Sequence, residues 1–479
     1  MTTKNWNEYQ RAIFEDVRSG EGHTFVSARA GTGKTTTIIE ALNHTGKART
    51  LLMAFNSSIA IELRARAPKE TSVLTFHSFG LRAISSAFGR PDVDKDKVIA
   101  EVARRLDFEK GEERAIGFAV ARVVSLAKGT LAQDEEEIGA LLDAFGILDS
   151  AECDEKDFER VVNLAADMLV WSRAQTSVID FDDMVWLPHT LGLRLPTFDR
   201  VFVDEAQDLN AAQIAISVRA VKAGGRIIAV GDDRQAIYTF RGADSEAVTK
   251  IVKELSAKVL PLSTTYRCGK KIVAQVQRIV PDFRAAETNP EGIVRYEAPD
   301  KMLGQIKGGD FLLSRTNAPL VGYCLGFLRA GRKAKINGKD VGTGLTSFVK
   351  SLKPKGVDGL IDKVNAWKEK EVTRLSKRNK SADAAIDKCE TILAFCQGAE
   401  SVPAILAKIE DLFANVTDDN CIVCSTTHKA KGLERERVFM LVDTYRPGKS
   451  IEEDNLYYVA ATRAKSELVF VSGKAAVQS

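Results

Sequence analysis

The sequence predicts an α/β protein with two parallel β-sheets, each interrupted by a mainly helical insertion. At 479 residues the chain is too long for a single hydrophobic core, so several domains are expected. Short apolar runs that end in small or polar residues recur along the chain, as expected for strands that are buried on both faces. Helical patterns fall between many of these runs, which favours parallel strands joined by helices.

The apolar runs form two groups that are separated near residues 260–270. In chain order they are TFVSA (24–28), TLLMAFN (50–56), SVLTFHS (72–78), FDRVFVDEAQ (198–207) and RIIAVGD (226–232), then DFLLSRTN (310–317), CIVCSTTHKAKG (421–432), RVFMLVD (437–443) and ELVFVSG (467–473). Two long stretches with helical patterns lack such runs. The predicted domains are a first sheet domain at 1–84 and 178–261 with a helical insertion at 85–177, and a second sheet domain at 262–343 and 418–479 with a short helical insertion at 344–417.

The composition, 44% hydrophobic and 28% charged, is typical of a cytosolic protein. No apolar run is long enough to span a bilayer and the opening MTTKNWNEYQ is polar, so we expect neither a membrane partner nor a secretory signal. The seven cysteines are scattered as reduced thiols would be, and CIVC (421–424) has no second pair at zinc spacing. The net charge of +3 does not by itself indicate nucleic-acid binding. Residues 339–380 hold 11 Lys or Arg against 5 Asp or Glu, which is more typical of a solvated face than of a phosphate-contacting surface.

The stretch SARAGTGKTTT (27–37) predicts a phosphate-binding loop between the strand at 24–28 and a helix. Gly31 and Gly33 permit a tight path that turns backbone N–H groups toward phosphate oxygens. Lys34 would reach the β- and γ-phosphates and Thr35 would hold Mg²⁺, while the helix N-terminus adds partial positive charge. Ala28 stands where the G-x-x-x-x-G-K-[ST] pattern has its first glycine, but the flanking strand and helix support the assignment. The predicted loop contacts to nucleotide are Ala30, Gly31, Thr32, Gly33, Lys34, Thr35 and Thr36.

Two adjacent acids, Asp204 and Glu205, follow the apolar run that ends at Val203. Asp204 would bind Mg²⁺ through water, and Glu205 would orient and deprotonate the attacking water. A single acid in this place commonly caps a helix, but a pair of acids in a chain with a phosphate loop favours catalysis. The two motifs together predict hydrolysis of a nucleoside triphosphate, and they leave open what that hydrolysis drives.

Further stretches follow in a fixed order: WNEYQRAI (6–13), AFNSSIAIEL (54–63), LTFHSFG (74–80), IDFDDM (179–184), VGDDRQAIYTFRGAD (230–244), LSTTYR (262–267), FLLSRTNA (311–318), STTHKAKGLE (425–434) and DNLYYVAATRAK (454–465). With the two motifs above, they resemble the UvrD/Rep group of superfamily 1 DNA helicases over nearly the whole chain outside the insertions. Within that group, the chain most resembles the helicase portion of F-box DNA helicases, in its compact length and in the stretches FNSSIA (55–60), IYTFRGA (237–243) and THKAKGLE (427–434). No F-box is expected ahead of WNEYQRAI, and compact phage or bacterial helicases fit equally well.

The resemblance implies two RecA-like P-loop NTPase domains, 1A and 2A, that carry insertions 1B and 2B and use ATP with Mg²⁺. Lys34 and Glu205 keep the catalytic roles given above. The other residues that match family positions at the nucleotide are Gln10 (adenine), Gln235 (γ-phosphate), Tyr266 (stacking on adenine), Glu434 (sugar or phosphate), and Arg267 and Arg463 (arginine fingers). Because both arginines lie in the second half of the chain, hydrolysis would depend on closure of the two halves.

The resemblance also implies that single-stranded DNA is bound by stacking bases on aromatic rings, beside basic and polar groups. The matching rings are Phe55, Tyr238 and Phe240, with His77, Arg241 and His428 beside them. Phe240 stands where the family more often has Trp, so its stacking would be weaker. The implied protein is a monomer that moves 3′ to 5′ on single-stranded DNA and acts at junctions of single and double strands, in the cytoplasm of a bacterium or phage host, or in a eukaryotic nucleus.

Two alternative functions and one question about insertion 2B remain open from the sequence. The first is a motor that displaces proteins from DNA, or that serves a repair, recombination or defence complex, with little unwinding of its own. The second is a P-loop NTPase switch or kinase unrelated to nucleic acid, against which Arg267, Arg463 and THKAKGLE (427–434) argue. The question concerns insertion 2B, which is much shorter than the corresponding domain of UvrD or Rep proteins. Whether it engages duplex DNA or inhibits the motor, as that larger domain does, therefore stays open. The basic residues of 339–380 could still contact duplex DNA.

Overall fold

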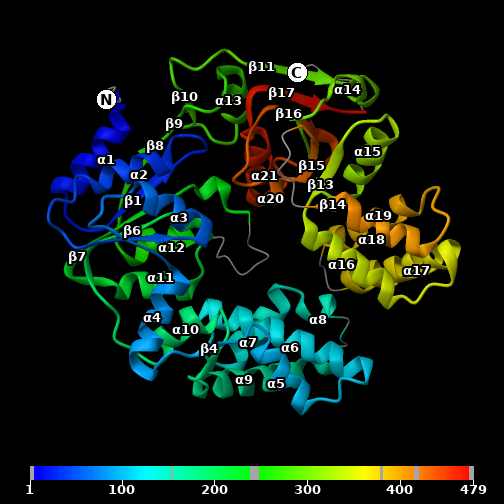
Figure 1. The fold of residues 1–479 in the computed structure, drawn as a ribbon, viewed down its shortest axis with the longest axis horizontal. Helices are drawn as coiled ribbons and strands as arrows, with labels where there is room; N and C mark the ends of the chain where they lie inside the picture. Colours follow the sequence, from blue (N-terminus) through cyan, green and yellow to red (C-terminus); the bar gives the residue numbers. More distant parts are fainter. Residues whose placement is uncertain are drawn as a thin grey trace. The chain divides into compact units, whose positions relative to one another are not determined.

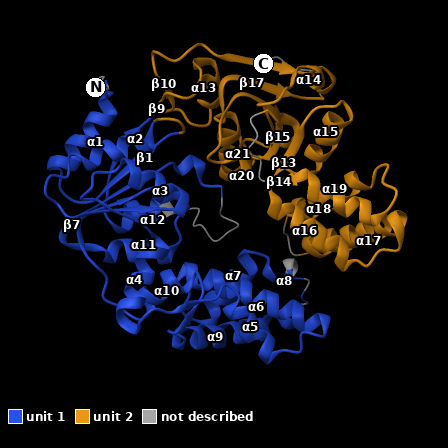
Figure 2. Ribbon diagram, in the orientation of Figure 1, with its two compact units in different colours: residues 1–29, 33–263 blue, residues 30–32, 264–479 orange. Residues whose placement is uncertain are grey.

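The computed structural model describes residues 5–151, 153, 155–237, 247–377, 381–414 and 420–473. The chain divides into two compact units: residues 1–29 with 33–263, and residues 30–32 with 264–479 (Figure 2). Each unit contains one large parallel sheet flanked by helices (Figure 1). These two sheets confirm the predicted α/β class.

The sheet of the first unit has six strands in the order β3-β2-β6-β7-β1-β8. The strands are β1 (Thr24–Ala28), β2 (Thr50–Ala54), β3 (Ser72–Thr75), β6 (Phe198–Val203), β7 (Val221–Gly231) and β8 (Lys258–Leu262). All neighbouring strands are parallel. Val26 of β1 lies opposite Val230 of β7, and Phe202 of β6 lies opposite Ile228 of β7. The carboxyl ends of β1, β7 and β6 are therefore adjacent, as at the ligand-binding edge of an open α/β sheet.

Helices cover both faces of this sheet. Helices α1 (Glu8–Ser19), α2 (Lys34–Leu42) and α3 (Ser57–Arg66) pack on one face, and α4 (Phe76–Phe88), α10 (Asp183–Thr190), α11 (Ala211–Arg219) and α12 (Ala247–Glu254) pack on the other. Phe25 and Val26 are consecutive in β1, face opposite clusters and are both buried. Burial on both faces explains why the strands of this sheet read as unbroken apolar runs.

A helical segment interrupts the first unit and has its own apolar core. It contains α5 (Lys97–Arg105), α6 (Gly111–Thr130), α7 (Glu135–Ala144), α8 (Ile147–Ser150) and α9 (Phe158–Ala174), between two short parallel strands, β4 (Asp92–Val93) and β5 (Val178–Ile179). Among the described residues, no single helix has the length and apolar character needed to cross a membrane, although α6 and α7 meet that test when taken together as a pair bent by 110°.

Four buried charges join this helical segment to the start of α10. Lys97 Nζ lies 2.5 Å from Asp183, and Lys128 Nζ lies 2.6 Å from Asp180 and 2.8 Å from Asp183. Asp183 also accepts the N–H of Asp180, and Asp180 accepts the N–H of Asp183. These contacts fix the short loop between β5 and α10, in which Phe181 is exposed.

The sheet of the second unit has seven strands in the order β11-β17-β16-β12-β15-β13-β14, all parallel. The strands are β11 (Ile293–Glu297), β12 (Phe311–Ser314), β13 (Ala334–Asn337), β14 (Phe413–Ala414), β15 (Ile422–Thr426), β16 (Arg435–Leu441) and β17 (Ala464–Val471), beside a short pair, β9 (Thr264–Thr265) and β10 (Arg284–Ala285). The helices outside the second helical segment are α13 (Lys270–Val276), α14 (Pro299–Gln305), α15 (Ala318–Arg329), α20 (Thr427–Ala430) and α21 (Ile451–Ala461).

The second helical segment comprises α16 (Lys339–Ser351), α17 (Gly356–Lys377), α18 (Asp383–Cys396) and α19 (Val402–Leu412). Its buried side chains share one continuous apolar cluster with the strands β12, β13, β15, β16 and β17. The carboxylate of Asp387 in α18 accepts the backbone N–H groups of Asn317 and Ala318 at the start of α15. This segment is thus packed as part of the second unit's core, unlike the segment in the first unit.

Candidate functional site

The predicted phosphate loop connects β1 to α2. Gly33 precedes the helix in the left-handed conformation, with φ of +79°, and Gly31 also has a positive φ, of +68°. Within the second unit, a Cβ added to Gly31 would lie 2.4 Å from Cβ of Arg267, so the site accepts only glycine. In the same unit the N–H of Ala30 donates to the Tyr458 hydroxyl over 2.8 Å.

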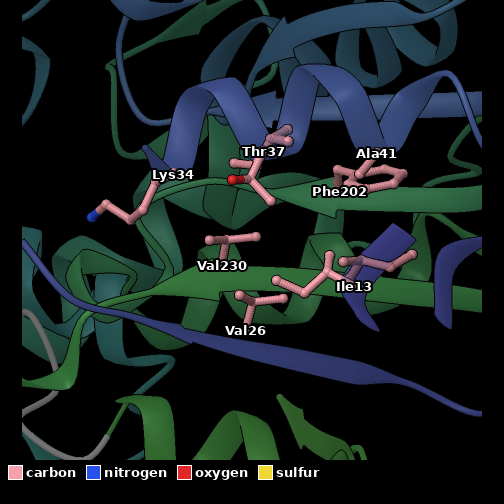
Figure 3. Close-up of a pocket in the computed structure, with 9 residues that line it drawn as sticks. Ile13, Val26, Lys34, Thr37, Ala41, Phe202 and Val230 are labelled. Atoms are coloured by element: carbon pink, nitrogen blue, oxygen red, sulfur yellow. The ribbon is translucent and has the colours of Figure 1, made fainter. Parts of the chain in front are cut away.

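Helix α2, which follows the loop, packs against the sheet through apolar contacts. Figure 3 shows Thr37 and Ala41 of α2 above Val26, Phe202 and Val230 of the sheet. The side chain of Lys34 extends away from these apolar groups at the start of the helix (Figure 3). Packing against the sheet therefore fixes the position of α2, and with it the backbone position from which the Lys34 side chain extends.

Lys34 and Glu205 are joined directly, with Nζ 2.8 Å from Oε2. Burial alone would lower the pKa of Lys34, but the carboxylates of Glu205, Asp232 and Asp204 raise it above its usual value. Lys34 therefore remains a cation at neutral pH. Glu205 has a left-handed backbone, with φ of +51°, which is a strained conformation for a residue with a side chain.

Asp204 is buried at the end of β6, and its Oδ1 accepts the N–H of Glu205 over 2.9 Å. Burial, and then the neighbouring Glu205, raises the pKa of Asp204 to about 7. A divalent cation would favour the ionised form of this carboxylate. Asp204 and the Thr35 hydroxyl at the start of α2 are hard oxygen donors of the kind that Mg²⁺ prefers, so the donor set fits this ion.

A side-chain network extends from Glu205 to the loop after β7. The Gln207 amide donates to Glu205 Oε2 over 2.6 Å, and its Oε1 accepts the N–H of Asp232 over 3.0 Å. Asp232 Oδ2 accepts from Nε2 of Gln235 over 2.7 Å. Lys34, Glu205 and Gln235, predicted from three separate motifs, are thus brought into one hydrogen-bonded chain within the first unit.

Gln10, the predicted adenine contact, is buried at the start of α1. Its Oε1 accepts the N–H of Asn7 as part of a capping box, and its Nε2 donates to the Thr37 hydroxyl over 3.0 Å. This bond joins the first helix to α2, which carries Lys34. Thr36, also predicted to contact nucleotide, accepts from Arg66 over 3.3 Å.

The second unit brings Arg267, Glu434 and Arg463 together. Arg267 Nε lies 2.5 Å from Glu434 Oε2, and Lys465 Nζ lies 3.0 Å from Glu434 Oε1. Burial would raise the pKa of Glu434, but these two cations hold it below its usual value. Tyr266, the predicted adenine-stacking ring, is exposed.

The two predicted arginine fingers differ in environment. Arg463 is fully buried and donates to the carbonyls of Val459 and Leu433 and to the Thr462 hydroxyl. Burial, aided by the nearby Arg267, lowers the pKa of Arg463 to about 10. Arg267 keeps part of its side chain exposed. Of the two, Arg267 has the environment of a group that can reach a ligand.

Two of the predicted DNA contacts, Phe55 and His77, follow the neighbouring strands β2 and β3 and are half-buried. The His77 ring stands edge-on to the exposed ring of Phe181, with centroids 6.4 Å apart. His428 is half-buried in α20 of the second unit. The predicted contacts Tyr238, Phe240 and Arg241 lie outside the described residues.

Four residues of this site were not predicted from the sequence: Arg29, Phe181, Gln207 and Asp232. All four residues lie within the sequence motifs described above. For Phe181, its position as an aromatic residue between acids in IDFDDM (179–184) was an available signal. Asp232 stands in the loop that supplies Gln235. Nothing in the sequence indicates that Arg29 pairs with Asp232, since the two are 203 positions apart.

Comparison with known proteins shows which family the chain resembles. Residues 6–256 match the family described as the UvrD/REP helicase N-terminal domain, and residues 334–474 match the UvrD-like helicase C-terminal domain. The chain is 25% identical to the ATP-dependent DNA helicase PcrA of Bacillus subtilis, over 61% of this chain and 43% of that protein. It is 24% identical to F-box DNA helicase 1 of Gallus gallus, over 97% of this chain and 48% of that protein.

It is also 27% identical to F-box DNA helicase protein 1 of Schizosaccharomyces pombe, over 57% of this chain and 34% of that protein. The chain therefore spans less than half the length of these curated relatives. The N-terminal family match extends over more than half of the chain and includes Lys34, Asp204, Glu205 and Gln235. The chain belongs to the UvrD/Rep helicase family.

Proposed function

We propose that this chain is an ATP-driven motor that moves 3′ to 5′ along single-stranded DNA and separates strands. The observation that carries the proposal is the hydrogen-bonded network from Lys34 through Glu205, Gln207 and Asp232 to Gln235, in which Gln207 is joined to Asp232 through the backbone N–H of Asp232. A network of this kind joins the phosphate loop to the segment that continues toward the predicted DNA contacts. Family membership supports the same assignment.

In this proposal Lys34 binds the β- and γ-phosphates of ATP, and Glu205 takes a proton from the water that attacks the γ-phosphorus. The bond from that phosphorus to the β–γ bridging oxygen breaks, and ADP and phosphate result. Mg²⁺, when held by Thr35 and Asp204, supplies positive charge to the phosphate oxygens. Gln235 contacts the γ-phosphate and so distinguishes ATP from ADP.

The arginines of the second unit would complete the site in the closed state. Arg267 is the residue we assign to the γ-phosphate, because it is partly exposed and its carboxylate partner, Glu434, can be exchanged for phosphate oxygens. Arg463 would support it from its buried position. Gln10 and Tyr266 are assigned to the adenine.

For DNA, we assign Phe55, His77 and the exposed ring of Phe181 to base contacts in the first unit. Phe55 and His77 follow the neighbouring strands β2 and β3, and the His77 ring stands edge-on to the Phe181 ring, which supports a shared stacking surface. Tyr238, Phe240, Arg241 and His428 remain proposed contacts from the family resemblance.

The proposed domains keep the boundaries given by the sequence: 1A at 1–84 and 178–261, 1B at 85–177, 2A at 262–343 and 418–479, and 2B at 344–417. One large parallel sheet in each unit supports the assignment of 1A and 2A. The proposed working form is a monomer on single-stranded DNA or at a junction with duplex DNA.

ATP hydrolysis with and without single-stranded DNA tests the proposal. We expect strong stimulation of the wild-type protein by DNA, and almost no hydrolysis by Glu205→Gln under either condition. An ATP turnover that single-stranded DNA does not change would overturn the motor assignment.

A second assay decides between strand separation and protein displacement. The second helical segment is short and shares a core with the sheet of its unit, which favours a motor with limited duplex engagement of its own. Strand displacement from a duplex with a 3′ tail should be compared with displacement of streptavidin from a biotinylated strand. Efficient streptavidin release with little unwinding would assign the chain to protein displacement.

A further inference from the structure

Asp232, at the carboxyl end of β7, is a fully buried carboxylate with several partners. Its side chain is 0% exposed. Oδ1 accepts from Arg29 over 3.2 Å and from the N–H of Arg234 over 3.2 Å, while Oδ2 accepts from Gln235 over 2.7 Å. Its own N–H donates to Gln207 over 3.0 Å.

Arg29 is the last residue before the loop segment Ala30–Thr32, and it is buried as well. Its Nη1 atom reaches Asp232 and also Asp233, whose carboxylate lies 2.5 Å away. A buried carboxylate is stable in its ionised form only when it is paired. Burial raises the pKa of Asp232 above its usual value, and Arg29, Lys34 and the Gln235 amide oppose this rise. The hydrogen bonds from Arg29, Arg234 and Gln235 show both carboxylate oxygens of Asp232 acting as acceptors.

The acceptor role of Asp232 Oδ2 has a consequence for Gln235. A carboxylate accepts hydrogen bonds but donates none, so it holds the NH₂ end of the Gln235 side chain and directs the carbonyl end elsewhere. Without a fixed acceptor the carboxamide could rotate and present either end. The orientation of the amide is thereby set by a carboxylate located beside the phosphate loop.

A purely structural ion pair would explain the burial of Arg29 and Asp232, but not their remaining contacts. Asp232 bonds to the side chain of Gln235 and, through its N–H, to Gln207, which itself contacts Glu205. One carboxylate thus joins the start of the phosphate loop, the proposed general base and the proposed γ-phosphate contact. This arrangement is typical of a group that positions a reacting residue.

We propose that Asp232, paired with Arg29, is the positioning residue that orients the Gln235 carboxamide toward the γ-phosphate of ATP. The proposal rests on the function proposed above, because it takes the γ-phosphate as the ligand of Gln235. Arg29 acts through Asp232 and need not contact the nucleotide.

The test uses a neutral-pair variant, Arg29→Gln with Asp232→Ala, which removes both charges of the buried pair and leaves Asp233, whose side chain is 40% exposed, beside Arg234. The preference for triphosphate is measured as the ratio of the Kd for fluorescent mant-ADP to the Kd for mant-AMPPNP, without DNA and without turnover. We expect this ratio to fall about tenfold in the neutral-pair variant and in Gln235→Ala, as one hydrogen bond to a charged group predicts. Combining all three substitutions should cause no further fall.

Steady-state kinetics provide a second readout. The neutral-pair variant should lower kcat for DNA-stimulated hydrolysis by about tenfold while KM for ATP changes less than about threefold. Arg29→Lys, which keeps the charge, should retain more than half of the wild-type ratio and kcat. A melting temperature close to that of the wild type confirms that the variants are folded.

Asp233→Asn is the matched control, because Asp233 also pairs with Arg29 but is 40% exposed. This variant should keep the wild-type triphosphate preference within about twofold. The positioning role would be overturned if the neutral-pair variant kept the wild-type ratio of the two Kd values. It would also be overturned if adding Gln235→Ala lowered that ratio further. A wild-type protein that shows no triphosphate preference would overturn both the positioning role and the γ-phosphate assignment of Gln235. If preference is present but DNA does not stimulate hydrolysis, only the motor assignment fails.

Discussion

Lys34 and Glu205 form an ion pair of 2.8 Å between residues that are 171 positions apart in the chain. The lysine begins α2 and the glutamate follows β6 in a left-handed backbone conformation that a glutamate adopts only under constraint. Bonds from Asp204 and Gln207 provide that constraint. The carboxylate that we assign as general base is thus held beside the cation that we assign to phosphate.

Substitution of Lys34 should weaken nucleotide binding, whereas substitution of Glu205 should slow hydrolysis. Lys34→Ala removes the cation for the phosphates, so the Kd for mant-AMPPNP should rise at least about tenfold. Glu205→Gln keeps the size of the side chain but removes the base, so nucleotide binding should be retained while kcat falls by about a hundredfold or more. Titration of mant-nucleotide fluorescence and a steady-state phosphate release assay measure the two quantities.

The control is Glu436→Gln, since this glutamate has a side chain that is 74% exposed. It should bind and hydrolyse ATP as the wild type does. Normal turnover by Glu205→Gln would exclude Glu205 as the general base.

Replacement of the two arginines in the second unit should separate catalysis from folding. Arg267→Ala should lower kcat by about a thousandfold with little change in melting temperature, because Arg267 is partly exposed and its bond with Glu434 is replaceable. Arg463→Ala should reduce the free energy of unfolding by about 3 kcal/mol, because this fully buried side chain would be lost together with its bonds to Val459, Leu433 and Thr462. ATPase assays and urea unfolding of both variants distinguish the two effects. If Arg267→Ala and Arg463→Ala reduced the free energy of unfolding equally, the proposed difference between the two arginines would be wrong.

Phe181→Ala should weaken the binding of single-stranded DNA without changing nucleotide affinity. The ring is 54% exposed and is held beside His77 by the buried charges of Asp180 and Asp183. Stacking of a base on an aromatic ring contributes about 1 to 3 kcal/mol, so the Kd for a fluorescent oligonucleotide should rise by about fivefold to a hundredfold.

Phe118→Ala is the matched control for this measurement, because Phe118 of α6 is similarly exposed, at 55%. Its Kd for DNA should equal that of the wild type. An unchanged Kd in Phe181→Ala would remove Phe181 from the DNA surface, whereas an equal rise in both variants would indicate a general effect on folding.

The central strands of both sheets and the edge strand β3 could be predicted from the sequence, whereas β8, β11, β13 and β14 could not. The predicted runs correspond to β1, β2, β3, β6 and β7 in the first unit and to β12, β15, β16 and β17 in the second. Most residues of β8 and β11 are exposed or half-buried, and β13 and β14 are short, so none of these forms a long apolar run. Apolar patterning reports burial, and it therefore finds only the strands that are covered on both faces.

For the candidate site, motifs predicted residue types but not the side-chain bonds between them. Lys34, Asp204 and Glu205 were recognisable because phosphate and metal chemistry demands those residues beside strand ends. The contacts of Arg29 with Asp232 and of Gln207 with Asp232 depend on the order β6-β7-β1 in the sheet, which places distant segments at one edge. A single sequence gives no signal for that pairing.

The buried pair of Asp16 and Arg226 predicts a pH dependence of stability. Asp16 Oδ2 accepts from Thr24 over 2.7 Å and from Arg226 over 2.9 Å, and both members of the ion pair are buried. Burial alone would raise the pKa of Asp16, but these hydrogen bonds and the charges of Arg226 and Lys258 lower it below the usual value of 3.8. The folded state therefore holds its proton less tightly than the unfolded state does.

A lowered folded-state pKa means that Asp16 contributes its full stabilisation above the unfolded-state pKa of about 3.9 and loses it as the pH falls through the lower folded-state value. Asp16→Asn leaves the charge of Arg226 uncompensated, so the free energy of unfolding at pH 7 should fall by about 3 kcal/mol. The difference between wild type and variant should stay constant from pH 8 to about pH 5 and shrink below about pH 4. Urea unfolding across this range measures it, with the exposed Asp362→Asn as the control that should match the wild type throughout. A difference that grows on acidification would show that Asp16 is not the group responsible.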